Sequence, residues 1–176
     1  MLFQNTSIPG VTIIELERHE DERGFFARAW CRKELEQQGL RAQIEQCSVS
    51  FNARAGTLRG MHYQRAPHTE TKIVTCLRGA IYDVVLDLRR PSPTYKKWVA
   101  VELSAESLRM IYIPEGCAHG FQTLAAGSLV QYQISDEYSP DHSTGVRWND
   151  PAFGIVWPPA GRTLSSRDAT YPDFLP

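Results

Sequence analysis

The chain has 176 residues and a formal net charge of −1, so its composition gives no reason to expect binding to nucleic acid or to a membrane surface. A chain of this length buries about 70% of the surface that its unfolded form would expose. No repeat, linker or low-complexity segment marks a second core, and we therefore expect one domain over residues 1–176.

The cysteines and the N-terminus favour a cytoplasmic protein with reduced thiols. Cys31, Cys47, Cys76 and Cys117 are far apart in the sequence and form no C-x-x-C motif. The first residues lack the basic region and apolar run of a secretory signal. Four cysteines could form two disulfides, but a chain of this size does not need them for stability.

Short apolar segments of period two dominate the chain and predict β-strands. In chain order, a strand is expected at residues 11–16, a helix at residues 32–38, and further strands at residues 72–77, 80–88, 98–103, 108–113 and 129–134. The helix has good helix formers and ends before Gly39. Turn signals such as Arg78-Gly79 separate the strands.

Beyond about residue 141 the sequence is irregular and rich in Trp, Pro and Asp, which predicts a tail folded against the strands. The class is therefore all-β. We prefer a jelly roll to an immunoglobulin-like sandwich, because the spacing of Cys, Trp and Cys that is typical of the latter is absent.

Two histidines stand in the most distinctive segments. His62 lies on a predicted strand and is followed by Glu70 and Lys72, whereas His119 is expected in a glycine-bounded turn between two strand-like segments. Such a cluster predicts a pocket that transfers protons or binds an anion. Strict alternation puts Arg59 and His62 on opposite faces of their strand, so both can serve one pocket only if Gly60 bends the strand or Arg59 contacts another part of the ligand.

Motifs along nearly the whole chain resemble the dTDP-4-dehydrorhamnose 3,5-epimerase family. They are residues 21–26, 59–64, Lys72, residues 83–89 and 92–94, 114–121, Tyr132, and residues 148–150 and 164–168. The resemblance implies a cupin-type jelly roll, which is a double-stranded β-helix, and a homodimer whose N-terminal strands cross to the partner. It also implies inversion of the stereocentres beside the C4 ketone of a nucleotide-linked 4-keto-6-deoxyhexose, in the biosynthesis of rhamnose-type sugars for cell-surface polysaccharides.

The implied reaction removes a proton beside a ketone and returns one to the opposite face, so it needs a base, an acid and positive charge near the enolate oxygen. His62 matches the family's base, and Asp168 matches the carboxylate that would fix its tautomer. Asp83, which alternates with apolar neighbours, is an alternative carboxylate. Tyr132 matches the proton donor and Lys72 the lysine near the ketone. Without the resemblance, each of these would be an ordinary packed or solvated side chain.

The resemblance also implies a set of substrate-binding residues. Those that match contacts to the nucleotide diphosphate or the sugar are Arg23, Arg59, His119 and Arg167. Phe26 and Tyr138 match aromatic positions beside the base. Arg28 stands where the typical member has a glutamate, and Ser143 lies near where another is expected, so the nucleotide, dTDP or CDP, stays open. Whether C3, C5 or both are inverted also stays open.

Two other classes compete with this interpretation. A metal-dependent cupin oxygenase or isomerase commonly has a His-x-His pair, which here reads His62-Tyr63-Gln64. With Glu70 and His119 as the remaining ligands, the donor set is too small for tight binding of a transition metal, so we expect no metal and no cofactor. A non-catalytic sugar-binding barrel would not need the set of His62, Lys72 and Tyr132.

Overall fold

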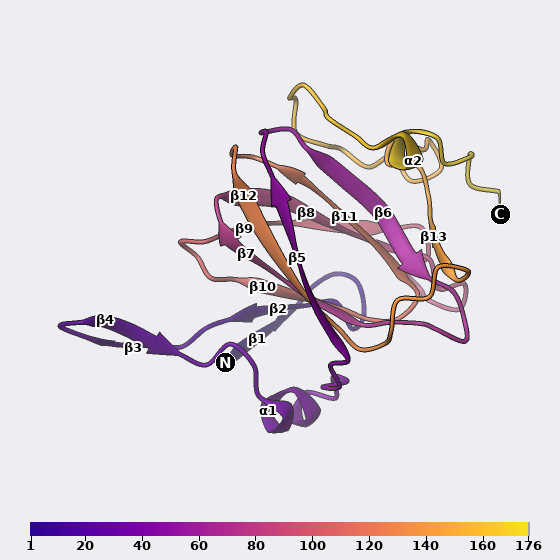
Figure 1. Cartoon of the computed structure of the whole chain (residues 1–176). Coiled ribbons are helices and arrows are strands. Elements are labelled where there is room, and N and C mark those ends of the chain that lie inside the picture. Colours follow the sequence, from indigo (N-terminus) through magenta and orange to yellow (C-terminus); the bar gives the residue numbers. More distant parts are fainter. Residues whose placement is uncertain (176) are drawn as a thin grey trace.

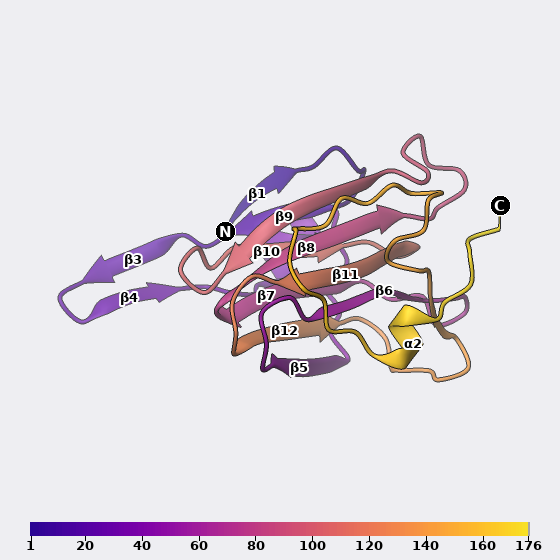
Figure 2. The same ribbon diagram turned by 90° about the horizontal axis from the view of Figure 1, so that it is seen from above.

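The computed structural model describes residues 1–175, which form two antiparallel β-sheets, a separate hairpin and two short helices (Figures 1 and 2). The six-stranded sheet has the order β1 (Leu2–Asn5), β2 (Thr12–Glu15), β10 (Met110–Ile113), β7 (Lys72–Arg78), β12 (Ser128–Ile134) and β5 (Gln46–Asn52). The five-stranded sheet has the order β13 (Ser143–Gly145), β6 (Leu58–Gln64), β11 (Cys117–Thr123), β8 (Ala80–Asp87) and β9 (Trp98–Ser104).

The main core lies between the two sheets. Alternate residues of neighbouring strands, such as Val74 and Val130 of the six-stranded sheet, meet Ile81, Val85 and Phe121 of the five-stranded sheet. All five side chains are buried, which is the outcome expected of a period-two pattern with one face turned inward. The all-β jelly roll predicted from the sequence is confirmed.

The outer faces of both sheets are partly covered. The C-terminal tail packs Phe153 and Trp157 onto the outer face of the five-stranded sheet, as its composition predicted. Helix α1 (Arg32–Gln37) packs Leu35 against Ile14 and Met110 of the six-stranded sheet. Helix α2 (Ser166–Ala169) lies over β6, on the opposite side of the molecule from α1 (Figure 1).

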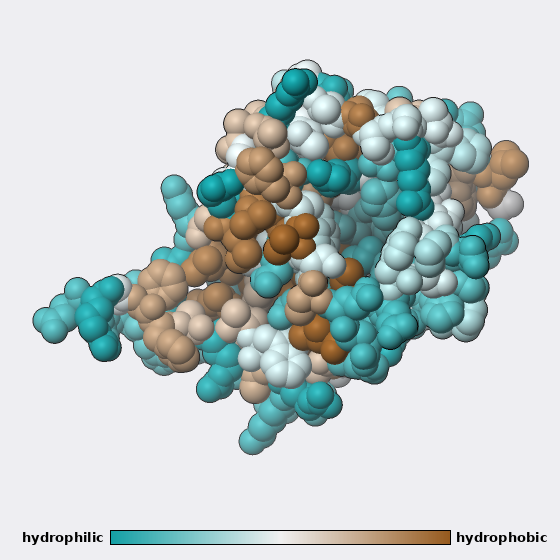
Figure 3. Space-filling model, in the orientation of Figure 1, coloured by the Kyte–Doolittle hydropathy of each residue, from teal (hydrophilic) through white to brown (hydrophobic). Residues whose placement is uncertain are grey.

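Within residues 1–175, strands β3 (Arg18–Asp21) and β4 (Gly24–Ala27) pair only with each other, and they extend away from the two large sheets (Figure 1). The outer side of β5 is also left uncovered by the part of the chain that the structure describes. Val49 and Phe51 are 63% and 55% exposed, and apolar side chains gather on this face beside the hairpin (Figure 3).

The prediction that His119 lies in a turn is wrong. All seven residues of β11 are buried, and β11 is hydrogen-bonded to β6 on one side and to β8 on the other. A strand that is buried on both faces shows no alternation of polar and apolar residues. Gly120, which suggested the turn, instead allows β6 to approach, because a Cβ at this position would lie 2.8 Å from the carbonyl oxygen of Arg59.

The four cysteines are unpaired. Neither helix in the described part of the chain has the length and the apolar sequence needed to cross a bilayer.

Candidate active site

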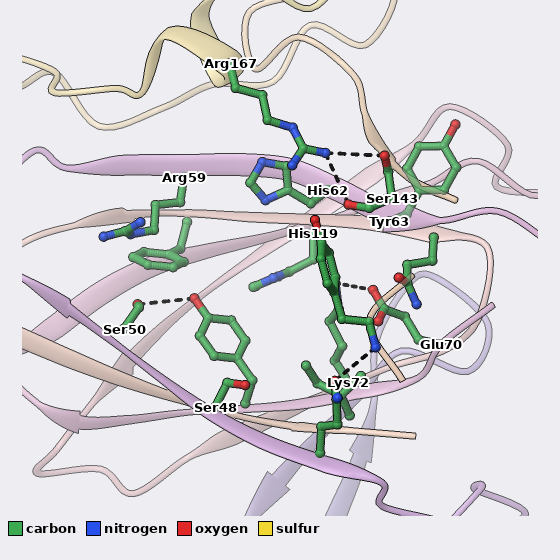
Figure 4. A pocket seen from close by; sticks show the side chains of 16 residues that line it. Ser48, Ser50, Arg59, His62, Tyr63, Glu70, Lys72, His119, Ser143 and Arg167 are labelled. Carbon is green, nitrogen blue, oxygen red and sulfur yellow. Dashed lines mark hydrogen bonds and ion pairs between the residues drawn. The ribbon is translucent and has the colours of Figure 1, made fainter. Parts of the chain in front are cut away.

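A cavity of about 300 Å³ opens between the two sheets (Figure 4). Strands β6 and β11 supply one wall, and strands β5, β7 and β12 supply the opposite wall. The predicted site residues that line this cavity are Arg59, His62, Lys72, His119, Tyr132, Tyr138 and Arg167. One space between the sheets therefore collects side chains from segments that are far apart in the sequence.

A bulge in β6 places Arg59 and His62 on the same cavity. His62 pairs with His119 and Arg59 pairs with Phe121, so three steps along β6 match two steps along β11. The extra residue reverses the alternation between Arg59 and His62. Gly60 has a φ of 131°, and a Cβ there would lie 2.5 Å from the Cα of Gly120. Of the two ways to a shared pocket that the sequence left open, the bend at Gly60 is the one present.

His62 and Asp168 form a close pair. Nε2 of His62 lies 2.6 Å from Oδ1 of Asp168, whose side chain is only 6% exposed. Asp168 belongs to α2, where its backbone N–H donates to the side chain of the N-cap residue Ser165 at 3.1 Å. The N–H of Gly60 donates to the other carboxylate oxygen at 3.4 Å. Burial alone would raise the pKa of Asp168, but His62 and these hydrogen bonds outweigh it and lower the pKa below its ordinary value.

The alternative carboxylate, Asp83, pairs with the other histidine. Its Oδ2 lies 2.8 Å from Nε2 of His119, and both side chains are buried inside the molecule. The ring of His119 stands edge-on to the ring of Tyr132, with centroids 6.2 Å apart. The structure therefore separates two histidine–carboxylate pairs, and Asp168 rather than Asp83 is the partner of His62.

Tyr132 and Lys72 project from the wall opposite His62. Lys72 Nζ lies 2.8 Å from Oε1 of Glu70, and both side chains are largely buried. The hydroxyl of Tyr132 lies 3.4 Å from Oγ of Ser50. Burial raises the pKa of Tyr132 to about 12, so the phenol keeps its proton at neutral pH.

Two guanidinium groups lie at the cavity. Arg59 donates from Nε to Oδ1 of Asn52 at 2.8 Å. Arg167 donates to the hydroxyl of Tyr171 at 2.8 Å and to Oγ of Ser143 at 3.1 Å. Neither arginine forms an ion pair with a carboxylate of residues 1–175, so both guanidinium groups are free to pair with an anionic ligand.

Arg23, Phe26 and Arg28 do not line this cavity. Arg23 pairs with Asp21 at the tip of the hairpin, and Phe26 is 72% exposed on β4. Nη1 of Arg28 lies 2.9 Å from Oε1 of Glu34. Within a single chain the hairpin extends away from the barrel, so these residues are remote from His62 (Figure 1).

Strand β5 also contributes to the cavity, although none of its residues was predicted to belong to the site. Gln46, Ser48 and Ser50 line it, whereas the residues between them face outward. The alternation of polar with apolar residues in this segment was a signal for a strand whose polar face is turned inward.

The donors that a metal-dependent cupin would use are engaged separately. His62 contacts Asp168, His119 contacts Asp83, and Glu70 contacts Lys72. Among residues 1–175, no three His, Cys, Asp or Glu side chains gather in an arrangement that could hold a metal ion.

The sequence model of the family described as dTDP-4-dehydrorhamnose 3,5-epimerase matches residues 5–175. The chain belongs to this family. A dTDP-4-dehydrorhamnose 3,5-epimerase of Sinorhizobium fredii is 41% identical over 99% of this chain and 90% of that protein. The predicted enzyme class, an isomerase that acts beside the C4 ketone of a nucleotide-linked 4-keto-6-deoxyhexose, is confirmed.

Solved structures agree with this assignment. The epimerase of Bacillus anthracis, solved with TDP and PPi bound, superposes with a TM-score of 0.94 at 40% identity and covers 98% of this chain and 99% of its own. A dTDP-6-deoxy-D-glucose-3,5-epimerase of Legionella pneumophila, in complex with dTDP-4-keto-L-rhamnose, gives a TM-score of 0.89 at 38% identity, with 95% of this chain and 89% of its own covered. The epimerase therefore has the fold of these enzymes over nearly its full length.

Proposed function

We propose that this epimerase inverts its substrate by proton transfer between two opposite walls of the cavity. The observation that carries the proposal is that His62 lies on β6 of one sheet, whereas Tyr132 lies on β12 of the other. A sugar ring held between these two walls presents one face to a base and the other face to an acid.

In the first step, His62 removes the proton from the carbon beside the ketone, and the electrons of the C–H bond move to form an enolate. Because Nε2 of His62 faces Asp168, Nδ1 is the ring nitrogen available to take the proton. The carboxylate of Asp168 stabilises the imidazolium that results, since its lowered pKa keeps it ionised at neutral pH.

In the second step, the hydroxyl of Tyr132 gives its proton to the same carbon from the opposite face, and the ketone forms again. The ammonium group of Lys72 stabilises the negative charge on the enolate oxygen between the two steps. Exchange with solvent then returns the proton from His62 to water and restores the proton of Tyr132.

Arg59, His119, Tyr138 and Arg167 bind the nucleotide part and the sugar in this proposal. Two free guanidinium groups suit a diphosphate, because they form bidentate hydrogen bonds to its oxygens. The TDP bound to the Bacillus anthracis enzyme and the dTDP-4-keto-L-rhamnose bound to the Legionella pneumophila enzyme support a dTDP-linked substrate here. The four unpaired cysteines support a reducing, cytoplasmic location.

We place the three remaining residues, Arg23, Phe26 and Arg28, at the cavity of a second subunit. The support is a hairpin that pairs only with itself, next to an uncovered apolar face on β5. A homodimer with exchanged N-terminal strands would bring the hairpin to the partner.

Light scattering, which measures the mass of the protein in solution, tests whether it is a dimer. Titration of dTDP and CDP against the wild type and Arg28→Glu tests the arginine, since a changed ratio of affinities requires contact with the base.

Incubation of dTDP-4-keto-6-deoxyglucose with the enzyme in deuterated water tests the reaction. Deuterium at C3, at C5 or at both identifies the carbons that are deprotonated, and the configuration of the product identifies those that are inverted. A folded enzyme that binds the nucleotide sugar without deuterium uptake would be a sugar-binding protein instead.

A further inference from the structure

A chain of hydrogen bonds on β5 leads from the cavity arginine to the proposed acid. Arg59 Nε donates to Oδ1 of Asn52 at 2.8 Å, and Nδ2 of Asn52 lies 3.3 Å from Oγ of Ser50. Oγ of Ser50 lies 3.4 Å from the hydroxyl of Tyr132 (Figure 4). Asn52 is 1% exposed, and its Nδ2 also contacts the backbone oxygens of Ser50 and Ser128.

The chemistry of these groups fixes the direction of the two bonds that Asn52 makes with Arg59 and Ser50. A guanidinium nitrogen only donates, so the amide oxygen of Asn52 must face Arg59 and the amide nitrogen must face Ser50. That nitrogen also only donates, so Oγ of Ser50 accepts from it. The oxygen of Ser50 has a second lone pair, so the contact between the two hydroxyls allows either of them to donate. When Ser50 donates, every bond of the chain runs from Arg59 toward the phenolic oxygen of Tyr132.

We propose that Ser50 is a positioning residue for the acid: its hydroxyl donates to the phenolic oxygen of Tyr132 and leaves the phenolic hydrogen free to point into the cavity. This inference rests on the proposed role of Tyr132 as the proton donor. If Tyr132 donated to Ser50 instead, its proton would be turned toward β5 and away from the sugar.

The same bond stabilises the acid after it has reacted. When Tyr132 gives up its proton, a phenolate forms at a buried position, where charge is costly. A hydrogen bond to an ionised oxygen is shorter and about twice as strong as a neutral one. The contact with Ser50 is therefore stronger in the transition state for reprotonation than before it, and such differential binding accelerates a step. Consistent with this, the contact with Ser50 opposes the effect of burial on the pKa of Tyr132.

The test measures two rates with the same substrate in deuterated water: uptake of deuterium, which requires His62, and formation of inverted product, which also requires Tyr132. Ser50→Ala should lower the ratio of inversion to deuterium uptake about tenfold, the effect expected of a lost hydrogen bond to a charged group. Ser50→Thr keeps the hydroxyl and should restore most of the ratio.

Ser48→Ala is the matched control. Ser48 lies two residues away on the same strand and lines the same cavity, and among residues 1–175 its side chain has no hydrogen bond to Tyr132. This variant should leave the ratio at its wild-type value, whatever it does to substrate affinity. An equal decrease of the ratio in Ser48→Ala and Ser50→Ala would overturn the inference, because it would show that any change on this face of β5 has the same effect.

Tyr132→Phe separates failure of this inference from failure of the proposed mechanism. If Tyr132→Phe lowers the ratio and Ser50→Ala does not, Tyr132 is the acid but Ser50 does not position it. If Tyr132→Phe inverts the substrate as fast as the wild type does, Tyr132 is not the acid, and the proposed role of Ser50 is then wrong as well.

Discussion

Oδ1 of Asp168 lies 2.6 Å from Nε2 of His62, although 106 positions separate the two residues in the chain. The contact joins the bulged strand β6 to the short helix α2 of the C-terminal tail. The carboxylate of Asp168 contacts His62 and accepts from the N–H of Gly60, and the backbone N–H of Asp168 donates to Oγ of the N-cap Ser165. A carboxylate fixed in this way holds the imidazole in one tautomer and orientation, which a base needs.

His62→Asn should abolish deuterium uptake from solvent, because it removes the base while an amide of similar size keeps the packing. We expect a loss on the order of 10²-fold or more in rate, measured by the appearance of deuterium in the sugar. His142→Asn is the control, since His142 contacts Ser139 outside the cavity. Near-normal uptake by a folded His62→Asn variant would rule out His62 as the base.

Asp168→Asn should slow deuterium uptake by about 10²-fold or more, because an amide cannot stabilise the imidazolium.

Asp168→Asn should also change how the free energy of unfolding depends on pH. The pKa of Asp168 is lower in the folded chain than in the unfolded one. The ionised carboxylate therefore stabilises the fold at any pH above the pKa of the unfolded chain, and this contribution is lost as the pH falls through the pKa of the folded chain. Denaturant unfolding should show wild type and variant converging below about pH 4. A difference that stays constant with pH would contradict this.

Tyr132→Phe should separate exchange from inversion. His62 still forms the enolate and returns a proton to the same face, so deuterium uptake should persist while epimerised product decreases. The pKa of about 12 adds a second expectation: loss of activity between pH 8 and about 10 should not come from ionisation of this phenol. Proton magnetic resonance of the product measures both uptake and configuration.

Gly60→Ala should destabilise the fold and lower activity together. The new Cβ would lie 2.5 Å from a backbone atom of Gly120, and the φ of 131° is unfavourable for alanine, so we expect a loss of at least about 1 kcal/mol. Gly24→Ala is a matched control, because Gly24 has a φ of 124° but no atom within 4 Å of an added Cβ. Comparable unfolding midpoints for the two variants would show that the contact with β11 is unimportant.

Exhaustive treatment with a chelator should leave the rate of epimerisation unchanged. The reason is that the proposed stabilisation of the enolate comes from the ammonium group of Lys72. Activity that is lost on chelation and restored by a single added metal would instead place the enzyme with the metal-dependent cupins.

The sequence by itself was sufficient for features that depend on neighbouring residues. The pattern of residues 11–16 predicted β2, in which buried and partly buried residues alternate, and the composition of residues 32–38 predicted α1. The ordered motifs predicted the family. Local patterns failed where burial on both faces removes alternation, as in β11, or where the polar face is the inner one, as in β5.

Only the tertiary structure decided which side chains meet. The sequence left Asp83 and Asp168 as alternative partners of His62, and the packing of the C-terminal tail onto β6 selected Asp168 while Asp83 reached His119. The bulge at Gly60 brought Arg59 to the same cavity, although simple alternation separates it from His62. Both outcomes depend on how distant strands and the tail are packed. Side-chain alternation along a strand does not contain that information, because it describes only which face of its own strand a residue occupies.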